Sequence, residues 1–438
     1  MDRAAVDTAE GYRLRGSPAS GLALATWGFF VGFGAVALYG PVAQQFKDSM
    51  GMSGMAVGLL VAAPQLMGTL LRIPFGAWVD RSGGRTPMLT LLGLSLVGMW
   101  GITFILFTID RLDAHAYPVI LILGFLAGCG VATFSVGVPQ VSYWFPKARQ
   151  GTALGLYGGV GNLAPGLFTL LLPLLLASLG LAYAYLVWFL FLLTGTVIYA
   201  LFARDAYSFQ LHRQHVGAEQ ARVIAARYGQ ELFPSGSIWG ALGTAASELR
   251  TWGLVFLYFT SFGGFLALTA WFPSYWSGFH GLDLVTAGLL SGIGFSLLAA
   301  VSRVAGGLLA DRFEGEVIAF VAFAAVLVGG VLLSFFSSLG IAVMGAVVLA
   351  MGMGTGNAAV FMLLPKYVPT AVGGAAGWVG GLGGIGGFFI PPVLGAFVDA
   401  MGIQGYRGGF FVYVVLAAFS IAVVFGFKRL QSDDSVGG

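Results

Sequence analysis

The chain alternates long apolar runs with short polar connections. Twelve runs reach about 20 residues or more, the length that an α-helix needs to cross roughly 30 Å of hydrocarbon. One polar segment, positions 203–250, is much longer than the other connections and separates the sixth run from the seventh. The pattern predicts transmembrane helices over 22–45, 54–80, 86–108, 116–141, 151–177, 181–202, 251–276, 285–311, 316–338, 341–364, 371–399 and 408–429.

Composition supports this interpretation. Of the 438 residues, 58% are hydrophobic and only 9% are charged, and the mean hydropathy is +0.89. Such values exclude a soluble protein with an apolar core. The predicted fold is an all-α membrane protein with an N-terminal six-helix bundle (1–202), a linker (203–250) and a C-terminal six-helix bundle (251–438). Within the linker, positions 217–227 fit an amphipathic surface helix.

The distribution of basic residues predicts the orientation in the membrane. Sixteen of the 21 lysines and arginines fall in the two tails, the linker and the other connections on the same side. Only Lys47, Arg111 and Arg407 fall in connections on the opposite side. Because cytoplasmic loops carry the excess of basic residues, we expect both termini and the linker in the cytoplasm, with the protein in the cell (inner) membrane.

Two arginines lie inside apolar runs at equivalent points of the two halves. Arg72 and Arg303 each precede an Asp-Arg doublet by eight residues, Asp80-Arg81 in the first half and Asp311-Arg312 in the second. An arginine near the centre of the bilayer costs about 2.5 to 3.5 kcal/mol on insertion scales, so a repeated pair indicates a function. Since the guanidinium group is a planar, permanently charged fork of donors, we expect the pair to bind a small anion.

Glycine is also patterned. The fifth predicted helix contains Gly155-x-x-Gly158-Gly159-x-Gly161, and the eleventh contains Gly377-x-x-Gly380-Gly381-x-Gly383 followed by further glycines. Small residues at such spacings let helices approach closely in lipid and allow sliding or bending contacts. We expect these glycines to lie where the two halves deform against each other.

These features resemble the major facilitator superfamily. Six helices, a long loop and six more helices with repeated motifs are typical of two parallel repeats around an axis normal to the membrane. The superfamily's loop signature is similar to the stretch from Gly76 through Asp80 and Arg81 to Arg85, and in weaker form to Gly306–Arg312. The resemblance implies twelve helices in two pseudo-symmetric bundles, a monomer, and loops that join the halves on the cytoplasmic side through ion pairs.

Within the superfamily, the glycine helices and the arginine pair resemble the nitrate/nitrite porter family. The two signature stretches of that family are similar to Gly155–Pro165 and Gly377–Pro391. The resemblance implies that Arg72 and Arg303 contact the substrate. It also places Phe134 at the family's sandwiching phenylalanine and Tyr258 at its tyrosine in the seventh helix, whose hydroxyl can donate to the anion.

The chain has two asparagines, Asn162 and Asn357, and both fall at membrane depth. Either they bind substrate or they form hydrogen bonds between helices, and the sequence leaves both roles open. Ala358 and Ala359 follow Asn357 where the family pattern has small polar or glycine residues, so the contribution of the tenth helix stays undecided.

The resemblance implies a secondary transporter of nitrate and nitrite that works by alternating access. Carboxylates and histidines are missing from the predicted helix centres, which favours nitrate/nitrite exchange, although the family also contains proton-coupled members. A carrier for formate, oxalate or a similar monocarboxylate, and a receptor that binds an anion without transport, are the alternatives. No phosphate-binding loop, metal-ligand cluster or nucleophile–base pair indicates an enzyme, a metal or a cofactor, and no basic domain indicates nucleic-acid binding.

Overall fold

The computed structural model describes residues 6–7, 11–109, 112–233, 238–309 and 313–436. Twelve helical stretches in these ranges are long and apolar enough to cross a membrane. Each coincides with a predicted helix to within a few residues at most ends, so the predicted all-α membrane fold is confirmed. The described residues also contain one antiparallel pair of two-residue strands near the N-terminus, β1 (Val6–Asp7) and β2 (Arg13–Leu14).

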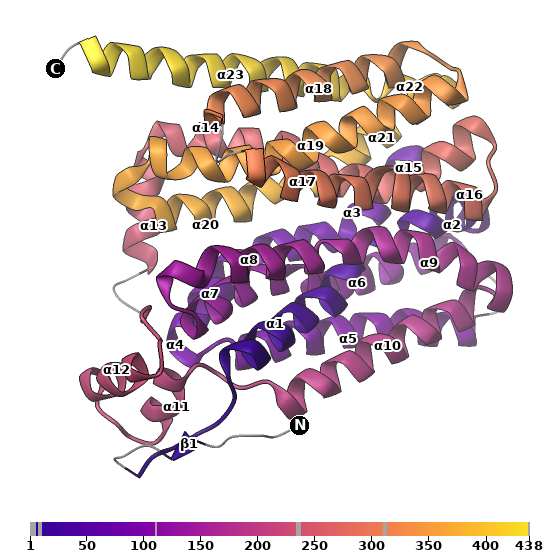
Figure 1. The fold of residues 1–438 in the computed structure, drawn as a ribbon. Helices are drawn as coiled ribbons and strands as arrows, with labels where there is room; N and C mark the ends of the chain where they lie inside the picture. Colours follow the sequence, from indigo (N-terminus) through magenta and orange to yellow (C-terminus); the bar gives the residue numbers. More distant parts are fainter. Residues whose placement is uncertain (1–5, 8–10, 110–111, 234–237, 310–312, 437–438) are drawn as a thin grey trace.

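The first six spans form one bundle, drawn from indigo to magenta in Figure 1. Several of these spans are broken into two helices by short irregular or 3₁₀ segments. The spans are Pro18–Met50 (α1, Pro18–Phe33; α2, Ala43–Met50), Gly54–Ser82 (α3, Gly54–Leu70; α4, Arg72–Ser82), Arg85–Thr108 (α5), Ala114–Trp144 (α6, Tyr117–Ala127; α7, Thr133–Trp144), Lys147–Leu179 (α8, Lys147–Gly161; α9, Leu163–Leu179) and Leu181–Phe202 (α10).

The last six spans form the second bundle, drawn from rose to yellow. The spans are Leu249–His280 (α14, Leu249–Tyr258; α15, Gly264–His280), Leu284–Gly307 (α16, Leu284–Leu289; α17, Leu298–Leu309), Gly315–Phe335 (α18), Leu339–Tyr367 (α19), Val372–Gly408 (α20, Val372–Leu382; α21, Gly386–Met401; α22, Gly405–Gly408) and Phe411–Arg429 (part of α23, Phe411–Val436).

Within the described ranges, nine short segments connect or interrupt these helices. Two of them are π-helical, η5 (Phe259–Gly263) and η6 (Leu290–Leu297), and both belong to spans of the second bundle. The others are 3₁₀ turns: η1 (Gly34–Ala37), η2 (Gly40–Val42), η3 (Ala114–Ala116), η4 (Gly128–Ala132), η7 (Pro369–Ala371), η8 (Gly383–Ile385) and η9 (Gly402–Gln404). π-helical insertions are frequent at functional sites, and η5 directly follows Tyr258.

The linker is helical. It contains α11 (Tyr207–Arg213), α12 (Ala218–Arg227), which matches the predicted amphipathic helix, and α13 (Ile238–Ser247). Helices α11 and α12 lie at the end of the molecule where α1 begins and α23 ends (Figure 1). We call this the terminal end and the other the opposite end.

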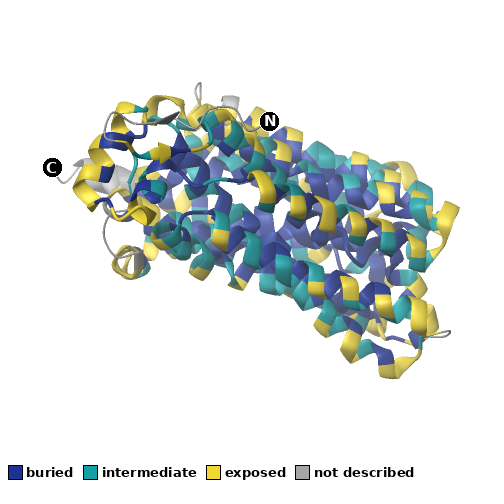
Figure 2. Cartoon of the chain, turned by 90° about the horizontal axis from the view of Figure 1, so that it is seen from below, coloured by how far each residue is buried: buried dark blue, intermediate teal, exposed yellow. Residues whose placement is uncertain are grey.

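Residues inside the two bundles are buried and those on the outer helix faces are exposed, as the colouring of Figure 2 shows. Large apolar residues are among the exposed ones, for example Trp100, Phe104, Leu201 and Phe419, which are 52 to 62% exposed. An outer surface of this kind is typical of a protein that contacts lipid. The bundles meet each other mainly through α3 against α21, and through α9 against α16 and η6.

Candidate functional site

A helix break positions Arg72. Helix α3 ends at Leu70 and α4 starts at Arg72, within one membrane span. Pro74 follows two residues later and has no backbone N–H, so it cannot bond to the carbonyl of Leu70, and its ring displaces that carbonyl. The hydrogen-bond ladder is therefore interrupted directly before the arginine, which lies in the first turn of the new helix.

The Arg72 side chain points into the protein and is only 3% exposed. Its Nη1 donates to the backbone oxygen of Gly380 at 2.7 Å, across to the second bundle. Its guanidinium carbon lies 5.4 Å from the ring centre of Phe134 and 5.0 Å from that of Phe262. The Nε and Nη2 atoms are buried and have no hydrogen-bond partner among the described residues. A charged group with two unmet donors is energetically costly unless a ligand accepts from them.

Arg303 lies on α17 and approaches the same ring. Its guanidinium carbon is 5.9 Å from the centre of Phe262. Because 5.0 Å separates the Arg72 carbon from that centre, the two guanidinium carbons are at most about 11 Å apart. Neither Arg72 nor Arg303 has an ion pair with a described residue, and the two guanidinium groups approach the same ring of Phe262.

Two cavities adjoin this pair of arginines. One, of about 260 Å³, has Arg72, Phe134 and Gly380 in its wall and extends along α4 to Asp80 at the terminal end. The other, of about 540 Å³, is lined by Arg303 and extends along α8 to Gly151. Phe134 and Phe361 line both cavities. The two cavities are therefore neighbours, and these two rings lie between them. Each cavity therefore connects a guanidinium with the terminal end.

Aromatic rings form the walls of this region. Phe134 is half-buried and stacks on Tyr157, with ring centres 6.1 Å apart. Tyr258 is fully buried and stacks on Phe262 at 4.9 Å, while its edge meets Phe361 at 5.2 Å. The Tyr258 hydroxyl has no hydrogen-bond partner among the described residues. It is therefore a further unmet donor, in addition to the two on Arg72.

The two asparagines are placed differently. Asn162 is 4% exposed and lies between the end of α8 and the start of α9. Pro165 has no backbone N–H to bond to the carbonyl of Gly161, so it interrupts the helix here as Pro74 does before α4. Its amide nitrogen donates to Gly158 of its own helix at 2.6 Å. Asn357 is 3% exposed, and its side-chain oxygen has no partner in the described part of the chain. Both line the larger cavity with Arg303.

Comparison with known proteins assigns this architecture. Residues 24–376 match the family model described as Major Facilitator Superfamily. The chain belongs to this superfamily.

Curated relatives have narrower names. A "Nitrite extrusion protein" of Bacillus subtilis (strain 168) is 28% identical over 379 residues, which is 86% of this chain and 87% of the relative. A "Probable nitrate transporter NarT" of Staphylococcus aureus (strain JH9) is 28% identical over 374 residues, or 85% and 87% of the two chains. These names agree with the predicted resemblance to nitrate/nitrite porters.

Solved structures share the fold. The xylose transporter XylE from E. coli, in a partially occluded inward-open conformation, superimposes with a TM-score of 0.70 at 14% identity, covering 94% of this chain and 97% of that one. A bacterial homologue of the human lysosomal transporter Spinster gives 0.66 at 16% identity, with 93% and 96% covered. The predicted superfamily fold is thus confirmed, and the chain belongs to a superfamily of membrane transporters.

The signature glycines of this superfamily member have two kinds of surroundings. A methyl group at Gly155 or Gly158 would meet nothing within 4 Å, and one at Gly159 would meet only Val304, at 3.9 Å. These three glycines line the larger cavity. At Gly161, by contrast, a methyl group would lie 1.8 Å from the ring of Phe29.

The glycines of the eleventh span follow the same division. A methyl group at Gly380 would have only Phe361, at 3.9 Å, as a neighbour, and one at Gly377 would lie 3.1 Å from Leu242. Gly381 packs on Ile73, and a methyl group at Gly383 would lie 2.7 Å from Tyr258. Glycine at 383 thus allows the α20–η8 junction to approach Tyr258, whereas glycine at 380 leaves the cavity open.

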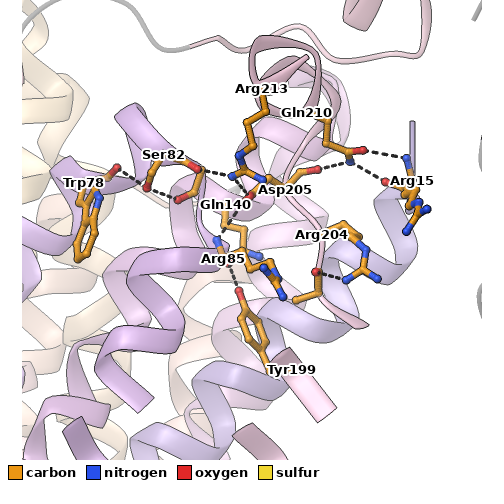
Figure 3. Close-up of polar contacts among 12 residues, drawn as sticks. Arg15, Trp78, Ser82, Arg85, Gln140, Tyr199, Arg204, Asp205, Gln210 and Arg213 are labelled. Atoms are coloured by element: carbon orange, nitrogen blue, oxygen red, sulfur yellow. Dashed lines mark hydrogen bonds and ion pairs between the residues drawn. The ribbon is translucent and has the colours of Figure 1, made fainter. Parts of the chain in front are cut away.

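The loop motif is anchored to its own bundle and to the linker. Asp80 accepts a hydrogen bond from the Tyr143 hydroxyl at 2.5 Å, while Arg81 is exposed. The backbone N–H of Arg85 donates to Asp205 at 2.8 Å, and Arg213 pairs with the same carboxylate (Figure 3). Among the described residues, none of the hydrogen bonds of Asp80, Arg81 and Arg85 reaches the second bundle. The corresponding Asp311 and Arg312 lie outside the described residues.

At the opposite end the two bundles are in direct contact. The carboxylate of Asp399 on α21 accepts from the backbone N–H groups of Gly54 at 2.5 Å and Met55 at 2.8 Å, which begin α3. Methyl groups at Gly54 or Gly58 would lie 2.4 and 2.3 Å from backbone oxygens of α21, so the two helices pack backbone to backbone. The site is therefore closed toward the opposite end.

Three aromatic residues of the site were not predicted from the sequence: Phe262, Phe361 and Tyr157. Phe262 contacts both arginines and stacks on Tyr258, four residues earlier. Residues four apart share a helix face, so the predicted role of Tyr258 contained the signal for Phe262. Phe361 and Tyr157 carry no comparable signal in a chain with 37 phenylalanines and 15 tyrosines.

Proposed function

We propose that this protein transports nitrate and nitrite across the membrane by alternating access. One observation carries the proposal: Arg72 is buried, lacks a carboxylate partner among the described residues, and keeps two unmet donors beside Arg303 and the ring that both arginines share. The names of the curated relatives support the choice of anion.

The electrostatics favour a single small anion. Two unit charges at most about 11 Å apart repel by at least about 1.5 kcal/mol at an effective dielectric constant near 20. A monoanion about 5.5 Å from each guanidinium gains about 3 kcal/mol from each of them on the same scale. Planar anions fit a site whose walls are the faces of Phe134 and Phe262 and whose donors are planar forks. The Tyr258 hydroxyl adds a donor at the edge.

The bundles 1–202 and 251–438 act as the two moving units in this proposal, with 203–250 as their tether. Both cavities reach the terminal end, and Asp399 closes the opposite end, which supports a conformation open toward the terminal side. Rocking of the bundles would close the terminal end around the anion and open the other. The cavity-lining glycines 155, 158, 159 and 380 leave room for that approach.

The terminal end faces the cytoplasm in this proposal, because sixteen basic residues lie on that side and three on the other. The protein acts in the cell membrane as a monomer, since one chain supplies both arginines and both halves of the site.

Exchange of nitrate for nitrite follows from the charge of the empty site. Without an anion, closing the bundles compresses two like charges, and with an anion the same movement is attractive. Proton-coupled nitrate uptake is the second candidate, and transport of formate or oxalate and binding without transport are the further alternatives.

The test uses purified protein in liposomes. We expect labelled nitrate to enter vesicles loaded with nitrite and not vesicles loaded with gluconate, with no dependence on a pH gradient. Uptake that needs a proton gradient and no internal nitrite would replace exchange by symport. Uptake of formate or oxalate with a KM below that of nitrate would change the substrate, and nitrate binding without flux under any gradient would refute transport.

A further inference from the structure

Thr69 has a buried hydroxyl with no partner. The residue is 1% exposed, and its Oγ1 forms no hydrogen bond with any described residue. Buried threonines in membrane helices normally donate to the carbonyl four residues earlier, as Thr103 does to Met99 and Thr169 does to Pro165, both at 2.8 Å. Thr69 is in the last turn of α3 and departs from this pattern, although an unmet buried hydroxyl costs about 1 to 3 kcal/mol.

The hydroxyl lies beside the proposed anion site. A methyl group at Gly384 would lie 3.2 Å from Thr69 Oγ1, 3.5 Å from Arg72 Nη1 and 3.7 Å from the ring of Phe262. Measured through that point, the hydroxyl oxygen and Nη1 are at most about 7 Å apart. Two donors at this separation can be bridged by one small anion, because each hydrogen bond to an oxygen spans about 2.7 to 3.0 Å. Glycine at position 384 keeps the space between them free of a side chain.

We propose that the Thr69 hydroxyl donates a hydrogen bond to the anion held at Arg72 and thereby favours nitrate over nitrite. This inference rests on the proposed function. Nitrate has three acceptor oxygens and nitrite has two, so a site with an additional donor gains more from nitrate. The guanidinium groups bind either anion through charge, whereas a neutral hydroxyl contributes only where an oxygen is within reach.

Two other roles for the hydroxyl give different results. If it accepted a hydrogen bond from Arg72 and only oriented that side chain, its loss would weaken both anions equally. If it only filled space, a residue of the same shape would replace it without effect. Valine has that shape and lacks the hydroxyl, alanine lacks both the hydroxyl and the bulk, and serine keeps the hydroxyl.

The experiment measures the ratio of the nitrate KM to the nitrite KM in proteoliposomes for Thr69→Val, Thr69→Ala and Thr69→Ser. Thr103→Val is the matched control, since it removes a buried helix hydroxyl on α5 that already has its partner. We expect both hydroxyl-free variants to raise the ratio about tenfold, the effect of one hydrogen bond to a charged group. Serine and the control should keep the wild-type ratio.

The KM ratio does not depend on how much active protein is reconstituted, so a loss of folding yield in one variant leaves the result readable. An unchanged ratio in both Thr69→Val and Thr69→Ala, or an equal rise of both KM values, would overturn the inference while the proposed function stands. Absence of nitrate and nitrite flux in the wild type would instead remove the proposed function.

Discussion

Replacing Arg72 by lysine tests the site most directly, because the charge is kept and only the geometry of the donors changes. Lysine loses the Nη1 bond to Gly380 and cannot present two parallel donors where Nε and Nη2 now lie buried. Its ammonium is also more strongly hydrated than a guanidinium, so burial between the rings of Phe134 and Phe262 is less favourable.

The magnitude follows from these contacts. One hydrogen bond between charged groups contributes about 1.5 to 3 kcal/mol, which corresponds to about 10- to 150-fold in affinity. Because the net charge of the site is unchanged, long-range attraction of the anion should persist. We therefore expect Arg72→Lys to raise the nitrate KM by at least tenfold, with the protein still inserted and monodisperse.

The assay is nitrite-driven counterflow of labelled nitrate into liposomes, with Arg149→Lys as the matched control. Arg149 is exposed near the start of α8, so the same substitution there changes no buried contact. A nitrate KM within about twofold of wild type for Arg72→Lys would mean that a positive charge at this position is enough to bind the anion. The argument from the unmet donors Nε and Nη2 would then be wrong.

Three further variants test separate parts of the structure. Phe262→Leu removes the ring shared by both arginines, and we expect a nitrate KM about 30-fold higher in counterflow, since a buried cation–π contact contributes about 2 kcal/mol; an unchanged KM would reduce Phe262 to packing. Gly161→Ala should lower the melting temperature through its clash with Phe29, whereas Gly158→Ala should melt like wild type; equal melting of the two would contradict the division of the glycines. Asp399→Asn should weaken the cap on α3 by about 0.3 to 1 kcal/mol and shift spin-label distances at the opposite end toward the open state; unshifted distances would show that backbone packing alone closes that end.

The twelve spans were predictable because a helix that crosses the bilayer needs about 20 consecutive apolar residues. Such a run can be recognised from the local sequence alone. The breaks within the spans were not predicted, although Pro74 and Pro165 mark two of them. A proline in a transmembrane helix produces a kink or a full break depending on the neighbouring helices, which the local sequence does not contain. The position of the Arg72 side chain depends on such a break.

The site residues were likewise predictable only where the local sequence is unusual. Arg72 and Arg303 were identified because arginine is rare within a membrane span and because the two occupy equivalent positions of the two halves. Phe262 and Thr69 are ordinary residues of membrane helices, and their importance comes from what lies opposite them. Phe262 is notable only because arginines from two different bundles approach its ring, and Thr69 only because its hydroxyl lacks the usual carbonyl partner.

In the proposed mechanism, the contact between Arg72 and Gly380 couples the ligand to the movement of the bundles. This hydrogen bond joins the first bundle to the second, but it uses only one of the guanidinium nitrogens. An anion that accepts from the remaining donors and from Arg303 adds further links between the bundles, at the point where like charges otherwise oppose their approach. A ligand can shift a conformational equilibrium only by its difference in affinity between the two states. In the proposed mechanism that difference is the set of cross-bundle contacts completed on closure, so we expect movement of the loaded carrier to be favoured over movement of the empty one.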